Sequence, residues 1–526
     1  MKLKKKEALL VHGGQVWTGV ELGDGSRPTA DAFLVKDGRF AAVGSLEEVE
    51  SAALGCDVDR INVEKSLVVP GMSDAHMHLT PYCKRELDLD LSAASSIDEL
   101  LSLLKAYVDN HPDVHWLRAM GYNENLWRKP VVPTMEMVDS VAGDHAVVLS
   151  HYGGHMHVAG RRALEESGLW GPEIEKAAGL LYDSEAAPVL QKITEAHETR
   201  EIIKKLAIEG FKRLASLGLT MVHACDVVLY GLSEYVSIFQ ELRDEGLLPV
   251  RVMTYHDALP NLDFRSGMGD RLVGYAGLKL FLDGTLGGWT AAMREDFSDK
   301  PGSRGQLIYT DDDLFSLLLE ASKRGIQVQM HMIGDAATDQ AVRVARRLYE
   351  RIGSKPRLPL RFNHVIVSPP DQIEALAALG VVVDIQPIQV HTDRLMAPLR
   401  LGPKRLGHAY PFRSLYRACI VTGSSDGPIE DVNPWVGIWA AVSRTEFDGT
   451  PLKSFDPREA LTLDEALTIY TKNPYRALGW QDCGVIALGA TADFVILESN
   501  PFNQDPRELL NVKVKSTYLD GVKTWG

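Results

Sequence analysis

The stretch PGMSDAHMHL, residues 70–79, follows the apolar, β-branched run SLVV and places His76 and His78 two residues apart. Side chains two residues apart on a strand point to the same face, whereas on a helix they would point to nearly opposite sides. On a strand, both imidazoles therefore project together while Met77 faces away. Such a pair can bind one metal ion, although two ordinary polar residues at a strand end would give the same pattern.

Seven further apolar runs follow this stretch, and amphipathic helical segments separate most of them. The eight candidate strands are residues 67–78, 220–225, 250–256, 277–284, 326–332, 360–365, 381–387 and 419–427. Eight alternating β and α segments are typical of an α/β fold closed into a (β/α)₈ TIM barrel. We expect this barrel over residues 68–479, with an insertion after strand one at about residues 80–218, because that gap is too long for one crossover.

Both ends of the chain contain short strands and turns. Residues 1–67 include ALLVHGGQVWTG and AFLVKDGRFAAVG, and residues 480–526 include GVIALGATADFVILESNP. The two ends therefore predict one small β-sandwich domain beside the barrel, formed by residues 1–67 and 480–526.

The composition narrows the class of partner. A chain of 526 residues with 45% hydrophobic residues can bury a large core, and its net charge of −15 argues against binding nucleic acid or an anionic membrane. The initial basic run KLKKK precedes only a short apolar segment, and no stretch is long enough to span a bilayer. The five cysteines are scattered without a CxxC motif, which is typical of thiols in a reducing compartment. We expect a cytoplasmic protein that acts on a small-molecule substrate and that can form a homo-oligomer.

Polar residues occupy the C-terminal ends of the expected strands, where TIM barrels carry their catalytic groups. They are His76, His78, His223, His256, Lys279, Asp283, His331, His364, Gln386 and Asp426. Any one of them alone is as well explained by capping or packing. Chance poorly explains a histidine pair on strand one, histidines on strands five and six, and an aspartate after strand eight, so the pattern predicts a metal site.

The chain resembles the amidohydrolase superfamily, in the branch that includes N-substituted formamide deformylase. The resemblance covers nearly the whole chain and rests on the segments PGMSDAHMH, GYNENLW, LKLFLDGTLGGWTAAM, VQMHMIGDAATDQAV, RFNHVIVSPPDQIEALAALGVVVDIQP, TGSSDGPIEDVNPWVGIWAAVSR and LTLDEALTIYTKNPYRALGW. It implies that His76 and His78 bind one metal ion and that His331 and His364 bind a second. It further implies that Lys279, as a carboxylated lysine, bridges both ions and that Asp426 completes the site.

The chemistry of these residues suits zinc. Neutral imidazoles and carboxylates are ligands of Zn²⁺, although other divalent metals remain alternatives. Two ions about 3.5–4 Å apart need an anionic bridge, which a carbamate formed from neutral lysine and CO₂ supplies. Lys279 faces inward on its expected strand, so it requires either modification or an ion pair, for example with Asp283. A single metal held by the histidines, with Lys279 as a structural ion pair, is the second interpretation.

A hydrolytic mechanism follows from this site. A metal-activated hydroxide would attack a carbonyl carbon, and Asp426 would take its proton and deliver it to the departing nitrogen. We therefore predict a metal-dependent hydrolase acting on a non-peptide C–N bond, of amide or formamide type. The alternatives are a deaminase, esterase or isomerase using the same site, or a non-catalytic binding protein on a hydrolase scaffold.

Five residues are candidates for substrate binding. His155 lies in HYGGHMHVAG, and Tyr122 and Trp127 lie in GYNENLW. Gln386 lies at the end of strand seven, and Trp289 follows the glycine-rich DGTLGG. The aromatic pair could line a lid over the pocket, but aromatic side chains are more often part of a core. The position of Trp289 after strand four suggests a loop that moves over the site.

Overall fold

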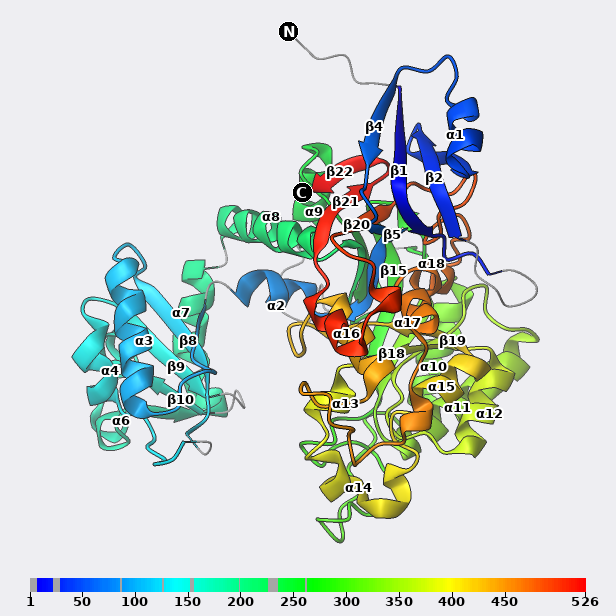
Figure 1. Ribbon diagram of the computed structural model, residues 1–526. Coiled ribbons are helices and arrows are strands. Elements are labelled where there is room, and N and C mark those ends of the chain that lie inside the picture. Colours follow the sequence, from blue (N-terminus) through cyan, green and yellow to red (C-terminus); the bar gives the residue numbers. More distant parts are fainter. Residues whose placement is uncertain are drawn as a thin grey trace. The chain divides into compact units, whose positions relative to one another are not determined.

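A computed structural model describes residues 7–21, 29–85, 88–124, 127–151, 156–197, 199–225, 235–260 and 263–526 of the chain (Figure 1). The chain divides into two compact units. The barrel unit comprises Met1–Tyr82 and Gly210–Gly526, and the inserted unit comprises Cys83–Glu209. The chain leaves the barrel unit within helix α2 (Leu79–Lys84) and returns to it within helix α8 (Arg200–Ser216).

The barrel unit contains the predicted parallel strands, and the α/β barrel fold is confirmed. Eight strands pair in the order β19-β18-β17-β16-β15-β13-β12-β6. They are β6 (Met72–Met77), β12 (Leu219–Ala224), β13 (Arg251–His256), β15 (Val273–Phe281), β16 (Gln327–Met332), β17 (Arg361–His364), β18 (Val382–Ile385) and β19 (Ile420–Gly423). The barrel is nearly closed by backbone hydrogen bonds beyond β19: Asp426 N donates to His76 O at 2.9 Å, and His78 N donates to Gly427 O at 2.7 Å.

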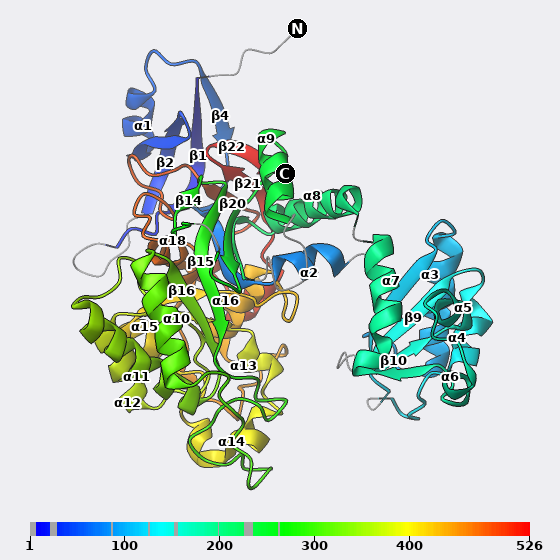
Figure 2. The same ribbon diagram turned by 180° about the vertical axis from the view of Figure 1, so that it is seen from behind.

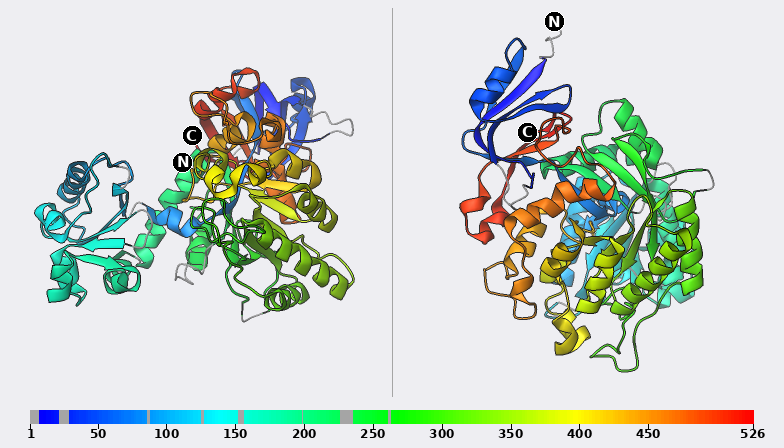
Figure 3. Two further views of the ribbon diagram at one scale, coloured as in Figure 1. Left: turned by 90° about the horizontal axis from the view of Figure 1, so that it is seen from below. Right: turned by 90° about the vertical axis from the view of Figure 1, so that its right-hand side faces the viewer.

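Helices lie outside these strands, as the right-hand view of Figure 3 shows. Figure 2 shows α10, α11 and α12 side by side along one part of the barrel. The helices that follow the barrel strands are α9 (Tyr235–Asp244), α10 (Asp311–Lys323), α11 (Asp335–Ile352), α12 (Pro370–Leu379), α13 (Gln389–Thr392), α14 (Ala397–Leu406), α15 (Phe412–Ala418), α16 (Pro434–Ser443), α17 (Leu463–Tyr470) and α18 (Lys472–Ala477). In α10, Thr310 caps the N-terminus, and Leu314 and Leu318 form part of its buried face.

The first expected strand, residues 67–78, is divided into two strands. β5 (Leu67–Pro70) pairs with β20 (Phe494–Leu497) in a sheet formed by the chain ends, whereas β6 pairs with β12 in the barrel. Gly71 separates them, and a Cβ atom at this position would lie 2.3 Å from Oγ1 of Thr220. The chain therefore leaves one sheet for the other where only glycine fits.

Strands from both chain ends pair in one mixed sheet of the barrel unit, and their delimitation as a separate β-sandwich domain stays a prediction. Its strand order is β22-β21-β20-β5-β1-β2-β3, and β4 also pairs with β1. Its other strands are β1 (Ala8–Trp17), β2 (Thr29–Lys36), β3 (Arg39–Gly44), β4 (Val58–Asn62), β21 (Val514–Leu519) and β22 (Val522–Trp525). The rings of Phe494 and Tyr518 stack with centroids 4.3 Å apart in its core, and α1 (Leu46–Ala52) contributes Val49 to a second cluster. Figure 1 shows these N- and C-terminal strands in blue and red.

The inserted unit has a sheet of its own. Strands β7 (Asp88–Asp90), β8 (Trp116–Tyr122) and β9 (Ala146–His151) are parallel, and β10 (Met156–Ala159) and β11 (Leu180–Tyr182) extend the sheet antiparallel. Its helices are α3 (Ile97–Asn110), α4 (Met135–Ala142), α5 (Arg161–Glu166), α6 (Pro172–Lys176) and α7 (Ala187–His197).

A two-residue strand, β14 (Met268–Gly269), adds to β15 in the barrel unit. Every helix in the described parts of the chain is too short or too polar to cross a bilayer.

Candidate metal centre

Three predicted ligands meet at the end of the barrel where the strands finish. His76, His364 and Asp426 each offer one ligand atom, and these atoms lie within 4.8 Å of one another. Asp426 Oδ1 is 3.0 Å from His76 Nε2 and 3.3 Å from Nε2 of His78. Imidazole nitrogens and a carboxylate oxygen at this spacing form a donor set that fits a divalent metal such as zinc.

Backbone contacts hold Asp426 opposite β6. The buried Asp74 carboxylate accepts hydrogen bonds from the backbone nitrogen of His76 at 3.1 Å and from that of Ser425 at 3.2 Å. The Ser425 hydroxyl also donates to Asp74. Asp426 itself adopts a left-handed conformation with φ of 60°. One carboxylate thus joins the strand carrying the histidine pair to the turn carrying Asp426.

The hydrogen bonds of His364 leave its Nε2 available to a metal. Gln386 Nε2 donates to Ser424 Oγ at 2.9 Å, so the amide oxygen faces His364 and accepts from Nδ1 at 2.6 Å. The ring proton is therefore on Nδ1, and Nε2, which is buried without a hydrogen-bond partner among the described residues, keeps its lone pair. The expected contact between Gln386 and a substrate stays a prediction, because its buried side chain here contacts His364 and Ser424.

His331 lies beside this cluster. Its ring centroid is 4.5 Å from that of His364, and its Nε2 donates to the carbonyl oxygen of Gly284 at 3.0 Å. A carbonyl can only accept, so Nδ1 of His331 carries the lone pair. The predicted binding of a second ion by His331 and His364 is chemically possible with these protonation states, and it stays a prediction.

Lys279 is buried inside the barrel, but it is not paired with Asp283. Its amine donates to Oδ1 of Asn363 at 2.9 Å and lies 4.7 Å from the centroid of the Phe281 ring. The Asp283 carboxylate instead accepts backbone hydrogen bonds from three residues: Ala292 at 2.9 Å, Ile333 at 3.0 Å and Gly334 at 2.8 Å. The ion pair between Lys279 and Asp283, one expectation from the sequence, is therefore wrong.

The electrostatics of the cluster suit a cation. Burial, reinforced by the Lys279 charge, lowers the pKa of His76 to about 3 and that of His331 to about 4, and burial also lowers the pKa of His364. Burial raises the pKa of Asp426, but its contacts with His76 and His78 outweigh this effect and hold the pKa well below its usual value. The histidines are thus neutral and Asp426 is ionised, as metal binding requires.

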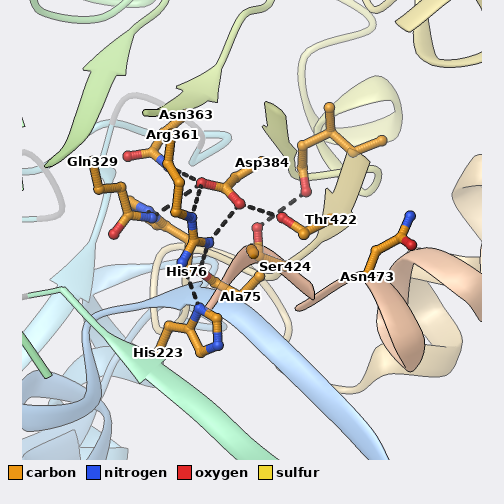
Figure 4. Close-up of polar contacts among 12 residues, drawn as sticks. Ala75, His76, His223, Gln329, Arg361, Asn363, Asp384, Thr422, Ser424 and Asn473 are labelled. Atoms are coloured by element: carbon orange, nitrogen blue, oxygen red, sulfur yellow. Dashed lines mark hydrogen bonds and ion pairs between the residues drawn. The ribbon is translucent and has the colours of Figure 1, made fainter. Parts of the chain in front are cut away.

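A buried polar network lies next to the ligands, and sequence reasoning did not find it (Figure 4). Arg361 and Asp384 are fully buried and paired, with Arg361 Nη2 2.5 Å from Asp384 Oδ1. Asn363, Gln329 and Thr422 also donate to Asp384. The available signal was spacing: Gln329 precedes His331 by two residues and Asp384 precedes Gln386 by two, so each pair shares the inner face of its strand.

Three of the other predicted substrate contacts have neighbours of their own within their units. Trp127 and Tyr122 belong to the hydrophobic core of the inserted unit, and Trp127 Nε1 donates to Ala94 O at 2.7 Å. In the barrel unit, Trp289 Nε1 donates to Asp299 Oδ1 at 3.1 Å, and the Arg400 guanidinium lies 3.9 Å from its ring centroid. His155 lies outside the described residues. Their roles in substrate binding stay predictions, as does closure of the Trp289 loop over the site.

The chain belongs to the amidohydrolase family, whose model matches residues 60–524. The putative amidohydrolase YtcJ of Bacillus subtilis is 29% identical over 97% of this chain and 98% of the relative. The N-substituted formamide deformylase of Arthrobacter pascens is 26% identical over 95% of each chain.

A solved structure shares the fold. The uncharacterized metal-dependent hydrolase from Pyrococcus horikoshii superposes with a TM-score of 0.79 at 24% identity, covering 95% of this chain and 99% of that one. The match to the family model and the full-length relatives confirm the resemblance to amidohydrolases inferred from the sequence.

Proposed function

We propose that this protein is a metal-dependent hydrolase that cleaves a non-peptide C–N bond, of amide or formamide type, in a small molecule. The observation that carries the proposal is the convergence of His76, His364 and Asp426, whose ligand atoms lie within 4.8 Å of one another in a buried site. Membership of the amidohydrolase family and full-length similarity to a formamide deformylase support the choice of bond.

The metal would be zinc, held by the predicted ligands. His76, His78 and Asp426 would bind one ion, and His331 and His364 a second. A bound zinc ion supplies polarisation of a carbonyl group and lowers the pKa of a coordinated water to about 7. Lys279 would lie between the two ions as a carbamate, in which its neutral amine forms an N–C bond to CO₂ and releases one proton. Burial lowers the pKa of this lysine to about 8, which increases the neutral fraction that can react.

Asp426 would carry the proton during turnover. Its carboxylate is ionised and buried, and Oδ1 faces the imidazoles of His76 and His78. It would accept a proton from the attacking water and donate it to the departing nitrogen, which would otherwise leave as a poor, anionic group.

The test combines metal analysis with a panel of N-formyl, N-acyl and cyclic amides. We expect stoichiometric zinc and hydrolysis of at least one amide class by the wild-type protein. Asp426→Asn should retain metal on the histidines and lose about 10²–10⁴-fold in kcat. Asp431→Asn, which changes an exposed carboxylate five residues further on, serves as the control and should retain activity.

Each other outcome has a defined meaning. Near-wild-type turnover by Asp426→Asn would refute the proton-carrier role. Turnover confined to amines, esters or isomerisable substrates would replace the proposed reaction with a deaminase, esterase or isomerase. Stoichiometric metal without any turnover would favour a binding protein on a hydrolase scaffold.

A further inference from the structure

We infer that Asp384, through Asn363, positions one of the predicted metal ligands, Lys279. The inference rests on the proposed metal centre and concerns residues that do not themselves bind the metal. It starts from the ion pair between Asp384 and Arg361, both of which have no solvent-exposed side-chain surface. Arg361 is anchored in turn by bonds to Ala75 O at 2.8 Å and to the Tyr255 hydroxyl at 2.7 Å.

Asn363 connects this ion pair to Lys279. Its Nδ2 donates to Asp384 Oδ2 at 2.5 Å, and its Oδ1 accepts from the Lys279 amine at 2.9 Å. Because an ionised carboxylate can only accept hydrogen bonds, Asp384 forces the amide nitrogen of Asn363 towards itself and the amide oxygen towards Lys279. The acceptor for Lys279 is therefore fixed before any metal binds.

This arrangement serves the amine and its carbamate equally. A lysine carbamate retains one N–H group, which is still a hydrogen-bond donor. The Asn363 oxygen can accept from it as it accepts from the amine, and this contact limits rotation about the terminal bonds of the lysine side chain. Asn363 thus acts on the orientation of Lys279 rather than on the reacting atoms.

Gln329 connects the same carboxylate oxygen to His76. Gln329 Nε2 lies 3.2 Å from Asp384 Oδ2 and 3.2 Å from Nδ1 of His76. An amide N–H can only donate, so Nδ1 of His76 accepts, and the ring proton lies on Nε2, which faces Asp426 Oδ1 at 3.0 Å. Gln329 therefore holds the His76 ring but, unlike Gln386 at His364, does not present the Nε2 lone pair to a metal. Figure 4 shows Gln329, Asn363 and Arg361 converging on Asp384.

The strand register makes the arrangement rigid. Lys279 is the register partner of Gln329, and Gln329 is that of Arg361 on the next strand. Asn363 is the partner of Asp384 on the strand after that. Four adjacent strands thus supply the network and the lysine, and no loop intervenes between them.

The test measures zinc affinity of metal-stripped protein by competition with a chromophoric chelator. Asn363→Leu removes the acceptor for Lys279 and keeps the ion pair, whereas Asp384→Asn removes the charge that orients both amides. We expect each variant to bind zinc about 10- to 100-fold more weakly than the wild type, the range typical of groups that orient ligands.

Asp493→Asn is the matched control, because the chain contains a second buried ion pair of the same type. Arg251 and Asp493 are each 1% exposed and 3.0 Å apart, and Arg251 begins β13, at the opposite end of the barrel from the ligands. This control should lower the thermal unfolding midpoint as the Asp384 variant does, but it should leave zinc affinity at the wild-type value.

The outcomes separate the two claims. Loss of zinc affinity in Asn363→Leu and Asp384→Asn, but not in Asp493→Asn, supports the inference. Wild-type affinity in Asn363→Leu, or equal loss in the Asp493→Asn control, overturns it while the proposed function stands. Absence of stoichiometric zinc in the wild-type protein would overturn the proposed metal centre and the inference together.

Discussion

Replacing Gln386 by leucine tests whether this residue orients a metal ligand or contacts a substrate. In the wild-type protein, its amide oxygen accepts from Nδ1 of His364 at 2.6 Å, and the two side chains are 2% and 4% exposed. Leucine has a similar volume and no acceptor. The Nδ1–H group would then be buried without a partner, at a cost of about 1–3 kcal/mol.

Without that acceptor, nothing fixes the ring proton of His364 on Nδ1, and a proton on Nε2 removes the lone pair that a metal needs. Zinc binding to Gln386→Leu must therefore also select the tautomer with the proton on Nδ1. Loss of an orienting partner typically weakens metal binding by about 10- to 100-fold, or about 1.4–2.8 kcal/mol. This range agrees with the cost worked out from the single lost hydrogen bond.

The assay is competition for zinc between the stripped protein and a chromophoric chelator, followed by steady-state kinetics on the best substrate. Gln386→Glu is the informative companion, because a carboxylate still accepts from Nδ1 and should preserve zinc affinity. Wild-type affinity in Gln386→Leu would refute the orienting role. A raised KM without a change in zinc affinity would instead support the substrate contact predicted from the sequence.

Two further predictions concern stability. Gly71→Ala places a Cβ atom 2.3 Å from Thr220 Oγ1 and should destabilise the barrel unit by about 1–3 kcal/mol in urea unfolding, whereas Gly287→Ala, at a position with open space, should be neutral; equal midpoints would contradict the steric argument. Burial raises the pKa of Glu430 from 4.5 to about 7, so this group stabilises the fold below pH 4.5 and that contribution is lost as the pH rises towards 7. Glu430→Gln should therefore gain stability relative to the chelator-treated wild type between pH 5 and pH 8, and a constant difference across this range would contradict the burial effect.

The strands and the positions of several candidate ligands were predictable because they depend on local rules. Alternation places His76 and His78 on one face, and the position of His364 follows from the end of a short apolar run. The partners of these ligands were not predictable in the same way. Asn363 meets Asp384, and Asp384 meets Thr422, because three strands pair in one particular register, which depends on the closure of the whole barrel.

The start of the barrel shows the same limit. Residues 67–78 read as one strand because the run is apolar and β-branched at its start and the two histidines at its end alternate with Met77. The division at Gly71 depends on Thr220 from β12 and on the Asp493 carbonyl oxygen, which accepts from Gly71 N at 2.9 Å. Both contacts come from segments more than a hundred residues away. A local pattern carries no information about such neighbours.

The two buried Arg–Asp pairs of the barrel unit can be compared to ask what each contributes. Removing two charges from water costs several kcal/mol per ion, and apolar residues of similar volume often stabilise a core as well or better. Arg251–Asp493 connects β13 to the segment before β20 and to the backbone of Asp520. An apolar pair could replace much of that packing contact.

Arg361–Asp384 differs because its neighbours are amides that must point in one direction. An apolar pair would fill the same volume, but Asn363 and Gln329 would then be free to rotate their amides, and the oxygen facing Lys279 could be exchanged for a nitrogen. The oxygen and nitrogen of an amide have almost the same shape, so packing alone does not select one orientation. A nearby charge is required to select it. We therefore assign the buried carboxylate of Asp384 to the proposed metal centre, even though it contacts no predicted ligand directly.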